Sequence, residues 1–269
     1  MLNTSPTVYR MAELAASPSW GTVDFISDLH LSQEEPATFT AWQAYLRATP
    51  ADAVFILGDL FEVWVGDDVV SADFPLQPQA SFENRCASVL KEAASRLALF
   101  FMQGNRDFLV GPALMALCNA TLLDDPAVLI FAGQRWLLSH GDALCLADTD
   151  YMAFRRQVRG QDWQQDFLAR PLAERQAIAQ GIRRQSEARK RSAHDYADVD
   201  ASAARDWLQA AQARTLIHGH THKPATHDLG EGFSRVVLSD WDAQAVVPRA
   251  DVLRLTASGL RRIALLPPP

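Results

Sequence analysis

Five short apolar segments of the chain are each followed directly by polar residues. They are residues 22–26, 53–57, 97–102, 135–138 and 215–217, with the sequences TVDFI, AVFIL, LALFFM, RWLL and TLI. Short apolar runs with polar boundaries are typical of buried β-strands. Helix-like stretches at residues 36–49 and 80–96 separate the first three segments, so this half of the chain predicts alternating strands and helices.

The later part of the chain predicts additional strands. Residues 127–139 (AVLIFAGQRWLLS) place a glycine-containing turn between two apolar runs, which predicts a β-hairpin. Residues 233–240, 250–256 and 260–266 predict further strands towards the C-terminus. Alternating strands and helices followed by a strand-rich end favour an α/β sandwich over a simple doubly wound sheet.

Length and composition limit the domain organisation. A chain of 269 residues can form one large domain, with or without an inserted subdomain. We expect residues 1–19 to be a loosely attached extension and residues 20–269 to form the domain. The N-terminus lacks the basic start and apolar stretch of a signal peptide, and no apolar run is long enough to cross a bilayer. Cys86, Cys118 and Cys145 lie far apart without a CxxC motif, which favours a reducing compartment.

The polar residues at the five predicted strand ends are all oxygen or imidazole donors. They are Asp28, His30, Asp59, Asn105, His140, His218 and His220. In layered α/β folds, loops that leave the carboxyl ends of strands gather at one edge, where ligands bind. Alternate residues of an extended chain point the same way, so Asp28 with His30, and His218 with His220, predict paired ligands.

Seven donors exceed the needs of one tetrahedral ion and suit two ions that share a carboxylate. Asp59, preceded by glycine, is the predicted bridge. Centres with two metals about 3.5–4 Å apart clamp the attacking and leaving oxygens of a phosphoryl transfer. Oxygen and nitrogen donors without sulfur fit Mn²⁺, Fe²⁺ or Zn²⁺, and we favour Mn²⁺. His222 is expected to orient a neighbouring group and not to bind a metal directly.

Charge is distributed unevenly along the chain. The net charge of −7 argues against general nucleic-acid binding. Residues 151–191 contain ten Arg or Lys and four acids, so this segment carries +6 and the rest of the chain −13. The same segment contains Phe154, Trp163 and Phe167, and helices with apolar and cationic faces can lie at an anionic membrane surface. An ordinary solvated basic helix is the alternative.

The ordered set DLH, GDLFEVW, GNRD, HGD and HGHTH resembles the calcineurin-like metallophosphoesterases, and it spans residues 28–222. The resemblance implies a two-sheet sandwich flanked by helices with a dinuclear metal centre. By motif, it assigns one ion to Asp28, His30, Asp59 and His220. It assigns the other ion to Asp59, Asn105, His140 and His218.

Arg106 occupies a position where most of that superfamily has histidine. Histidine can protonate a departing alkoxide, whereas a guanidinium stays charged and cannot. Such a site works best with a leaving group that needs no proton, such as a phosphate. We therefore expect cleavage of a phosphoanhydride, with Arg106 holding phosphate oxygens through its forked donors. A loop ion pair between Arg106 and Asp107 is the structural alternative.

The segments ILGDLFEVWVGDD, GNRDF and IHGHTHKP, with EEPA after DLHL, resemble one branch of the superfamily, the UDP-2,3-diacylglucosamine diphosphatases of lipid A biosynthesis. The resemblance implies water attack on the nucleotide-side phosphorus, giving UMP and 2,3-diacylglucosamine 1-phosphate. The catalytic residues it implies are Asp59, Asn105, Arg106 and His140. The substrate contacts it implies are Asn105, Arg106, Asp148, Ser186, Lys190 and His218. After Ser186 the chain departs from the family pattern, so Arg189 or Arg191 could replace Lys190.

The same resemblance implies a helical cap over the acyl chains of the substrate, here at about 151–200. It implies a protein on the cytoplasmic face of the inner membrane, with a nucleotide-linked glycolipid as substrate. We expect no nucleic acid and no obligate protein partner. Two other functions remain open: a soluble metallophosphoesterase for nucleotide or dinucleotide polyphosphates, and a non-catalytic scaffold on the same fold.

Overall fold

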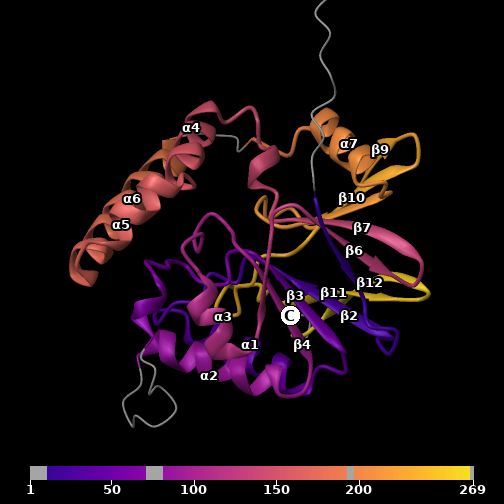
Figure 1. Cartoon of the computed structure of the whole chain (residues 1–269), viewed down its shortest axis with the longest axis horizontal. Helices are drawn as coiled ribbons and strands as arrows, with labels where there is room; N and C mark the ends of the chain where they lie inside the picture. The colour runs from indigo at the N-terminus through magenta and orange to yellow at the C-terminus, as the bar shows by residue number, and fades with distance from the viewer. Residues whose placement is uncertain (1–10, 71–80, 193–196, 267–269) are drawn as a thin grey trace, which may run out of the picture.

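Two six-stranded sheets face each other across a layer of apolar side chains, with helices on the outer faces (Figure 1). The structure is a computed structural model that describes residues 11–70, 81–192 and 197–266, and of residues 185–192 it describes the backbone only. The α/β sandwich predicted from the chain is confirmed.

We call the two sheets the first and the second. The second sheet has the strand order β12-β11-β2-β3-β4-β5. Its strands are β12 (Gly259–Ala264), β11 (Asp251–Thr256), β2 (Thr22–Ile26), β3 (Ala53–Leu57), β4 (Ala98–Met102) and β5 (Thr121–Leu123). Strands β2 to β5 run parallel, so their carboxyl ends share one edge of the sheet. All five residues of β3 are buried because both faces of this central strand are covered.

Helices α1 (Pro36–Ala48), α2 (Phe82–Ala94) and α3 (Pro112–Cys118) cover the outer face of the second sheet (Figure 1). Local sequence fixes where they start. Proline occupies the first turn of α1 and of α3, where the missing N–H costs nothing. The side chain of Ser81 accepts a hydrogen bond from the backbone N–H of Asn84 and so caps α2.

The first sheet has the order β1-β6-β7-β8-β10-β9. Its strands are β1 (Ala12–Ala15), β6 (Ala127–Phe131), β7 (Gln134–Ser139), β8 (Thr215–His218), β10 (Phe233–Val237) and β9 (Thr226–Gly230). The predicted hairpin is confirmed as β6 and β7, joined through Ala132 and Gly133, which both have positive φ. Helix α7 (Ala201–Ala210) covers the outer face of this sheet.

The expectation of a loosely attached extension at residues 1–19 is wrong for part of it. Residues 12–15 form β1, which pairs in parallel with β6 along the edge of the first sheet. The side chains of this segment, AELA, are largely exposed in the structure. Its sequence therefore lacks the apolar run by which a buried strand is recognised. Backbone pairing with a neighbouring strand determines its structure.

Three helices between β7 and β8 lie on one side of the sandwich (Figure 1). They are α4 (Thr149–Val158), α5 (Gln161–Leu168) and α6 (Leu172–Ser192), and they occupy most of the region in which we expected a helical cap. Phe167 of α5 is buried, and its ring stacks on Trp163 with centroids 4.8 Å apart. Within the described ranges, no helix has the length and apolar character needed to span a membrane.

Candidate metal centre

The loops that follow β2, β3 and β4 of the second sheet meet the loops that follow β7 and β8 of the first sheet. Backbone hydrogen bonds fix this meeting point. The N–H of Asp28 donates to the carbonyl of Gly58 at 3.1 Å, and the N–H of Gly219 donates to the carbonyl of His140 at 3.0 Å. The N–H of His220 donates to Asp28 Oδ2 at 2.9 Å and so joins the two sheets. The predicted convergence of strand ends is therefore present.

Asp28, Asp59 and His140 form the buried centre of this site. One donor atom from each lies within 4.8 Å of the others, a spacing that can hold a metal ion. His140 Nε2 is 3.7 Å from Asp59 Oδ1. The other ring nitrogen, Nδ1, donates to the carbonyl of Leu57 at 2.9 Å, so Nε2 is the nitrogen directed at the centre.

Asn105 and His220 lie on one side of His140. Asn105 Oδ1 is 3.0 Å from His140 Nε2 and 2.8 Å from His220 Nδ1. The rings of His140 and His220 have centroids 5.1 Å apart. These three residues come from three different strand ends, and the structure brings them together as the sequence predicted.

His30 and His222 lie on the other side, next to Asp28. Donor atoms of these three residues form a second group within 4.8 Å. His222 Nε2 is 3.4 Å from Asp28 Oδ1 and 3.3 Å from His30 Nε2. The ring of His222 thus lies beside Asp28 and His30, and the role of His220 as a metal ligand stays a prediction. The backbone of His220 bonds to Asp28, while its ring turns towards Asn105.

His218 is fully buried but has different neighbours. Its Nε2 lies 3.4 Å from a guanidinium nitrogen of Arg235, and its Nδ1 lies 2.9 Å from the carbonyl of Gly219. As the last residue of β8, His218 alternates with Ile217, which faces the layer between the sheets. Its role as a metal ligand stays a prediction.

Two glycines allow the carboxylates to approach the neighbouring loops. A Cβ added to Gly104 would lie 2.1 Å from Asp59 Oδ1, and a Cβ added to Gly219 would lie 2.2 Å from Asp28 Oδ2. Both distances are far below van der Waals contact. Glycine is therefore required at both positions, because a side chain there would overlap the carboxylate of Asp59 or of Asp28.

The electrostatics of the centre fit a cation. Burial raises the pKa of Asp28, but its contact with His222 and the nearby His140 and His30 outweigh burial and lower it. Burial lowers the pKa of His140, but Asp59, Asp142 and Asp28 outweigh this and raise it to about 9. Carboxylates that hold a proton on a buried imidazole would also stabilise a divalent cation. The donor set, without sulfur, suits hard or borderline divalent ions.

Asp107 holds the metal loops in place. Its carboxylate accepts hydrogen bonds from four backbone N–H groups, two at 2.8 Å from Leu60 and Gly104 and two longer ones from Asp59 and Phe61. Burial and the neighbouring Asp59 raise the pKa of Asp107 to about 7. The alternative of a loop ion pair with Arg106 is wrong, since Asp107 is occupied by the backbone.

Arg106 lies beside the centre and contacts Glu62. Its backbone N–H donates to Asp59 Oδ1 at 2.8 Å, and its guanidinium is 3.5 Å from Glu62 Oε1. Burial raises the pKa of Glu62, but contacts with His30, Arg106 and Arg183 outweigh burial and hold it at about 2. Glu62 and the role of Asp107 were not predicted from the sequence, although these residues lie inside the GDLFEVW and GNRD segments.

The predicted substrate contacts outside the metal loops are only partly described. Asp148 caps α4, where its side chain accepts a hydrogen bond from the N–H of Tyr151 at 3.0 Å. The Tyr151 ring lies 5.9 Å from that of His220, which places the start of α4 at the metal centre. The side chains of Ser186, Lys190, Arg189 and Arg191 lie outside the described residues.

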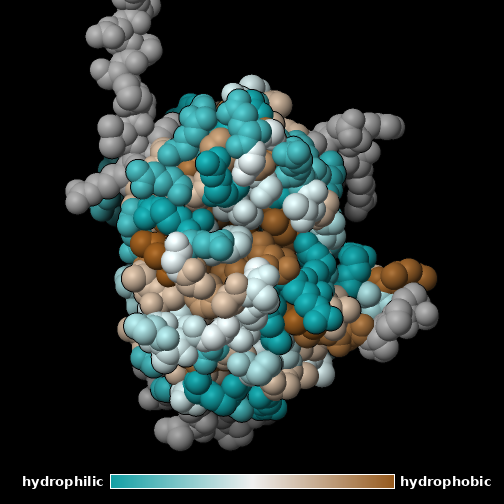
Figure 2. Space-filling view, turned by 90° about the vertical axis from the view of Figure 1, so that its right-hand side faces the viewer, coloured by the Kyte–Doolittle hydropathy of each residue, from teal (hydrophilic) through white to brown (hydrophobic). Residues whose placement is uncertain are grey.

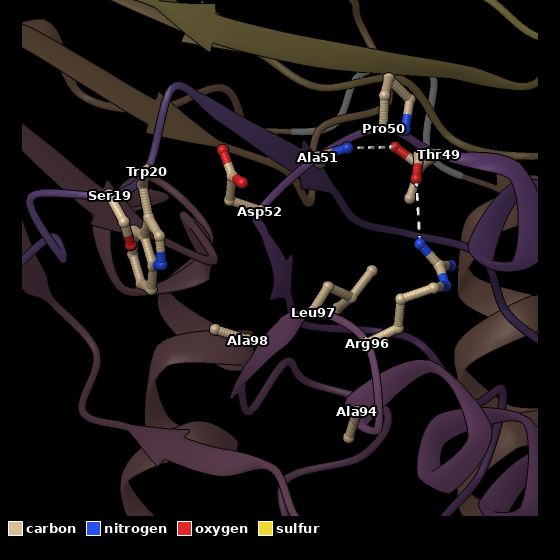
Figure 3. Close-up of a pocket in the computed structure, with 10 residues that line it drawn as sticks. All are labelled: Ser19, Trp20, Thr49, Pro50, Ala51, Asp52, Ala94, Arg96, Leu97 and Ala98. Atoms are coloured by element: carbon tan, nitrogen blue, oxygen red, sulfur yellow. Dashed lines mark hydrogen bonds between the residues drawn. The ribbon is translucent and has the colours of Figure 1, made fainter.

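A separate open cavity of about 500 Å³ lies near the amino ends of β3 and β4 (Figure 3). Trp20 and Asp52 line one side of it, and Arg96 and Leu97 line another. The Asp52 carboxylate accepts hydrogen bonds from the N–H groups of Gly21 and Thr22, and so supports the chain entering β2. The residues that line this cavity include none of the predicted metal ligands, so it is distinct from the centre.

The sandwich and its oxygen and imidazole donors at converging strand ends define a metallophosphoesterase. Residues 21–224 match the family model of the calcineurin-like phosphoesterases, and the chain belongs to this family. Its curated relatives include proteins named UDP-2,3-diacylglucosamine hydrolase from three bacteria. That of Chromobacterium violaceum is 44% identical over 90% of this chain and 98% of its own length. That of Ralstonia nicotianae is 44% identical over 87% and 89%, and that of Aromatoleum aromaticum 43% identical over 84% and 92%.

Proposed function

We propose that this protein hydrolyses the pyrophosphate bond of UDP-2,3-diacylglucosamine, giving UMP and 2,3-diacylglucosamine 1-phosphate in lipid A biosynthesis. The observation that carries the proposal is the similarity to UDP-2,3-diacylglucosamine hydrolases along 90% of the chain. The position of Arg106 supports it, because an arginine at the metal centre suits a phosphate leaving group.

Two divalent cations at this centre, when bound, supply Lewis-acid stabilisation of developing phosphate charge and favour deprotonation of the attacking water. Asp28, His30, Asp59 and His220 would hold one ion, and Asp59, Asn105, His140 and His218 the other. Nearly all polar contacts at the centre come from strand-end loops fixed by backbone hydrogen bonds. The ligands are therefore positioned before substrate arrives, as catalysis by preorganised charge requires.

Arg106 would hold oxygens of the diphosphate. Its backbone is bonded to Asp59 and its guanidinium is only 16% exposed, so its orientation relative to the bridging carboxylate is restricted. Charge-assisted bonds from a planar guanidinium match a phosphate better than a point charge does. The leaving group of this cleavage is 2,3-diacylglucosamine 1-phosphate, which departs as a phosphate and needs no proton from the protein.

We propose Mn²⁺ as the native metal and α4 to α6 as the cap that receives the acyl chains at the cytoplasmic face of the inner membrane. The donor set supports Mn²⁺ without excluding Fe²⁺ or Zn²⁺. Leu146 and Leu168 are large apolar residues with more than two fifths of their surface exposed, one just before α4 and one at the end of α5. These exposed apolar side chains, one before α4 and one at the end of α5, support contact with a lipid.

The deciding experiment is hydrolysis of UDP-2,3-diacylglucosamine with Mn²⁺ in ¹⁸O-labelled water, with both products analysed by mass spectrometry. We expect one ¹⁸O atom in UMP and none in the lipid phosphate, because water attacks the nucleotide-side phosphorus. Label in the lipid phosphate would contradict the proposed direction of attack. Equal turnover of unacylated UDP-glucosamine or of dinucleotide polyphosphates would favour a soluble nucleotide phosphoesterase, and no turnover of any of them would favour a scaffold.

A further inference from the structure

Glu62 lies at the junction of three functional elements. Its backbone N–H donates to the carbonyl of Leu31 at 3.2 Å, and the N–H of His30 donates to the carbonyl of Asp59 at 3.0 Å. These bonds join the loop after β2 to the loop after β3. The Glu62 side chain is therefore held between the metal loops, and it is only 12% exposed.

One carboxylate oxygen of Glu62 faces a metal ligand. Glu62 Oε2 lies 2.8 Å from His30 Nδ1. A carboxylate at this nitrogen favours the tautomer with the proton on Nδ1, which leaves the lone pair of Nε2 for a metal. His30 Nε2 is the nitrogen that points towards Asp59, at 3.9 Å from its Oδ2. The short separation between Glu62 and Nδ1 therefore favours Nε2 as the nitrogen of His30 that binds a cation.

The other oxygen of Glu62 faces two arginines from distant parts of the chain. Glu62 Oε1 is 3.5 Å from Arg106 and 3.2 Å from Arg183, which belongs to α6. Two guanidinium groups repel each other, and a shared carboxylate allows both to lie on the same side of the site. The Arg183 side chain is 34% exposed and the Arg106 side chain 16%. The contact through Glu62 therefore connects the surface at α6 with the more buried metal centre.

We propose that Glu62 is a positioning residue that couples the metal ligand His30 and the phosphate-binding Arg106 to α6 through Arg183. Loss of the carboxylate would weaken metal binding through His30 and loosen α6 through Arg183. The role of Arg106 in this inference rests on the proposed function. The coupling itself concerns metal binding and the mobility of α6, and both can be measured without a nucleotide substrate.

The test compares Glu62→Gln with Glu174→Gln in the full-length protein. Glu174 of α6 forms an exposed pair with Arg170, which precedes the helix, so the control removes a Glu–Arg pair at α6 but not at the site. For Glu62→Gln we expect the Mn²⁺ concentration at half-saturation in equilibrium dialysis to rise about tenfold or more, as for other residues that orient metal ligands. We also expect faster hydrogen exchange in the α6 peptide that contains Arg183. The control should change neither.

The proposal is overturned if Glu62→Gln binds Mn²⁺ as the wild type does, if exchange in α6 is unchanged, or if the control shifts both to the same extent. Should Glu62→Gln not fold, Arg183→Gln replaces it, because it removes the α6 contact and keeps the contact with His30. Faster exchange in α6 with unchanged Mn²⁺ binding supports the coupling, and unchanged exchange overturns it. Failure of the proposed function would leave these measurements intact and appear only in the hydrolysis assay.

Discussion

At the scale of single residues, the metal centre is built on unusual backbone conformations. Five residues of the centre have φ between 48° and 66°, in the left-handed region that non-glycine residues rarely adopt: Asp28, His30, Asp59, His220 and His222. Such conformations cost of order 1–3 kcal/mol each and persist where the surrounding structure enforces them. Here the backbone bonds between the loops enforce them. The protein accepts this cost in stability because these turns direct the donors to one point.

Arg106→Lys tests the shape requirement at the phosphate-binding position. Lysine keeps the positive charge but loses the planar fork, so we expect kcat for the diphosphate to fall by about 100-fold or more. Metal content should stay at the wild-type level, because the ligand side chains are unchanged. The measurements are steady-state turnover and bound Mn²⁺ per chain. Arg205→Lys on α7 is the matched control, and equal activity of Arg106→Lys and wild type would refute the role.

The sequence predicted which donors meet but not how they are oriented. Asp28, Asp59 and His140 could be predicted because each lies two residues after the end of an apolar run. The directions of the His220 and His222 rings could not, because they depend on how this loop packs against Asp28 and Asn105. Glu62 and Asp107 were missed because their contacts arise only when two loops pack. The one available signal was an acid three residues after Asp59 and another two after Asn105.

At the scale of elements, a buried arginine of α6 binds the loop that follows β3, the same loop that carries Asp59. Arg175 is only 2% exposed. Its guanidinium donates to the carbonyl of Val65 and to both carboxylate oxygens of Asp68, and its Nε donates to the carbonyl of Arg170. A guanidinium buried in this way is stable only because each donor group has an acceptor. Helix α6 and the loop after β3 are therefore packed as one unit.

Arg175→Met should destabilise the protein, with a characteristic pH dependence. The variant leaves the Val65 carbonyl without its donor, which costs about 1–3 kcal/mol. The hydrogen bond from Arg175 lowers the pKa of Asp68 in the folded protein. The stability that this pair contributes is therefore present above the unfolded pKa of about 4. It is lost as the pH falls through the lower pKa of the folded state. Denaturant unfolding at pH 7 and pH 3 should show the wild-type advantage shrinking at low pH. A difference that grows at low pH would contradict this account.

The predicted strands match the structure, whereas two short strands of the structure were not predicted. Residues 22–26, 53–57 and 127–139 correspond to β2, β3 and the β6–β7 hairpin. Strand β5 has three residues, and β9 (THDLG) alternates with little apolar content, so neither gives a strand pattern. Their structure comes from pairing with β4 and β10.

At the scale of the whole molecule, the arginine side chains that the structure describes in residues 151–191 fall into two groups, one bonded inside the protein and one exposed. Several arginines of this segment are used inside the protein. Arg155 pairs with Asp142 at 2.8 Å, and Arg159 donates to the carbonyl of Gly104 at 2.8 Å. Arg156 and Arg184 are exposed. The opposite face of the molecule, in contrast, shows a hydrophobic area framed by hydrophilic residues (Figure 2).

The exposed arginines offer a test of the proposed contact with a membrane. Each cationic side chain near an anionic surface contributes about 1 kcal/mol to binding. The double variant Arg156→Glu with Arg184→Glu should therefore lose at least tenfold in binding to vesicles that contain anionic lipid, measured by cosedimentation. Hydrolysis of a soluble short-chain substrate should be unaffected. Undiminished vesicle binding would indicate that these arginines belong to an ordinary solvated helix surface.

The pairing of β1 with β6 has a practical consequence for expression of this protein. A truncated variant that starts at residue 20 would lack β1, and the hydrogen-bonding groups along one side of β6 would then be open. The sequence of β6, AVLIF, is apolar and rich in β-branched residues, which is the kind of open strand edge that recruits a second molecule. Removal of residues 1–19 should therefore cause self-association through β6. The intact chain should remain monodisperse at concentrations where the truncated variant aggregates.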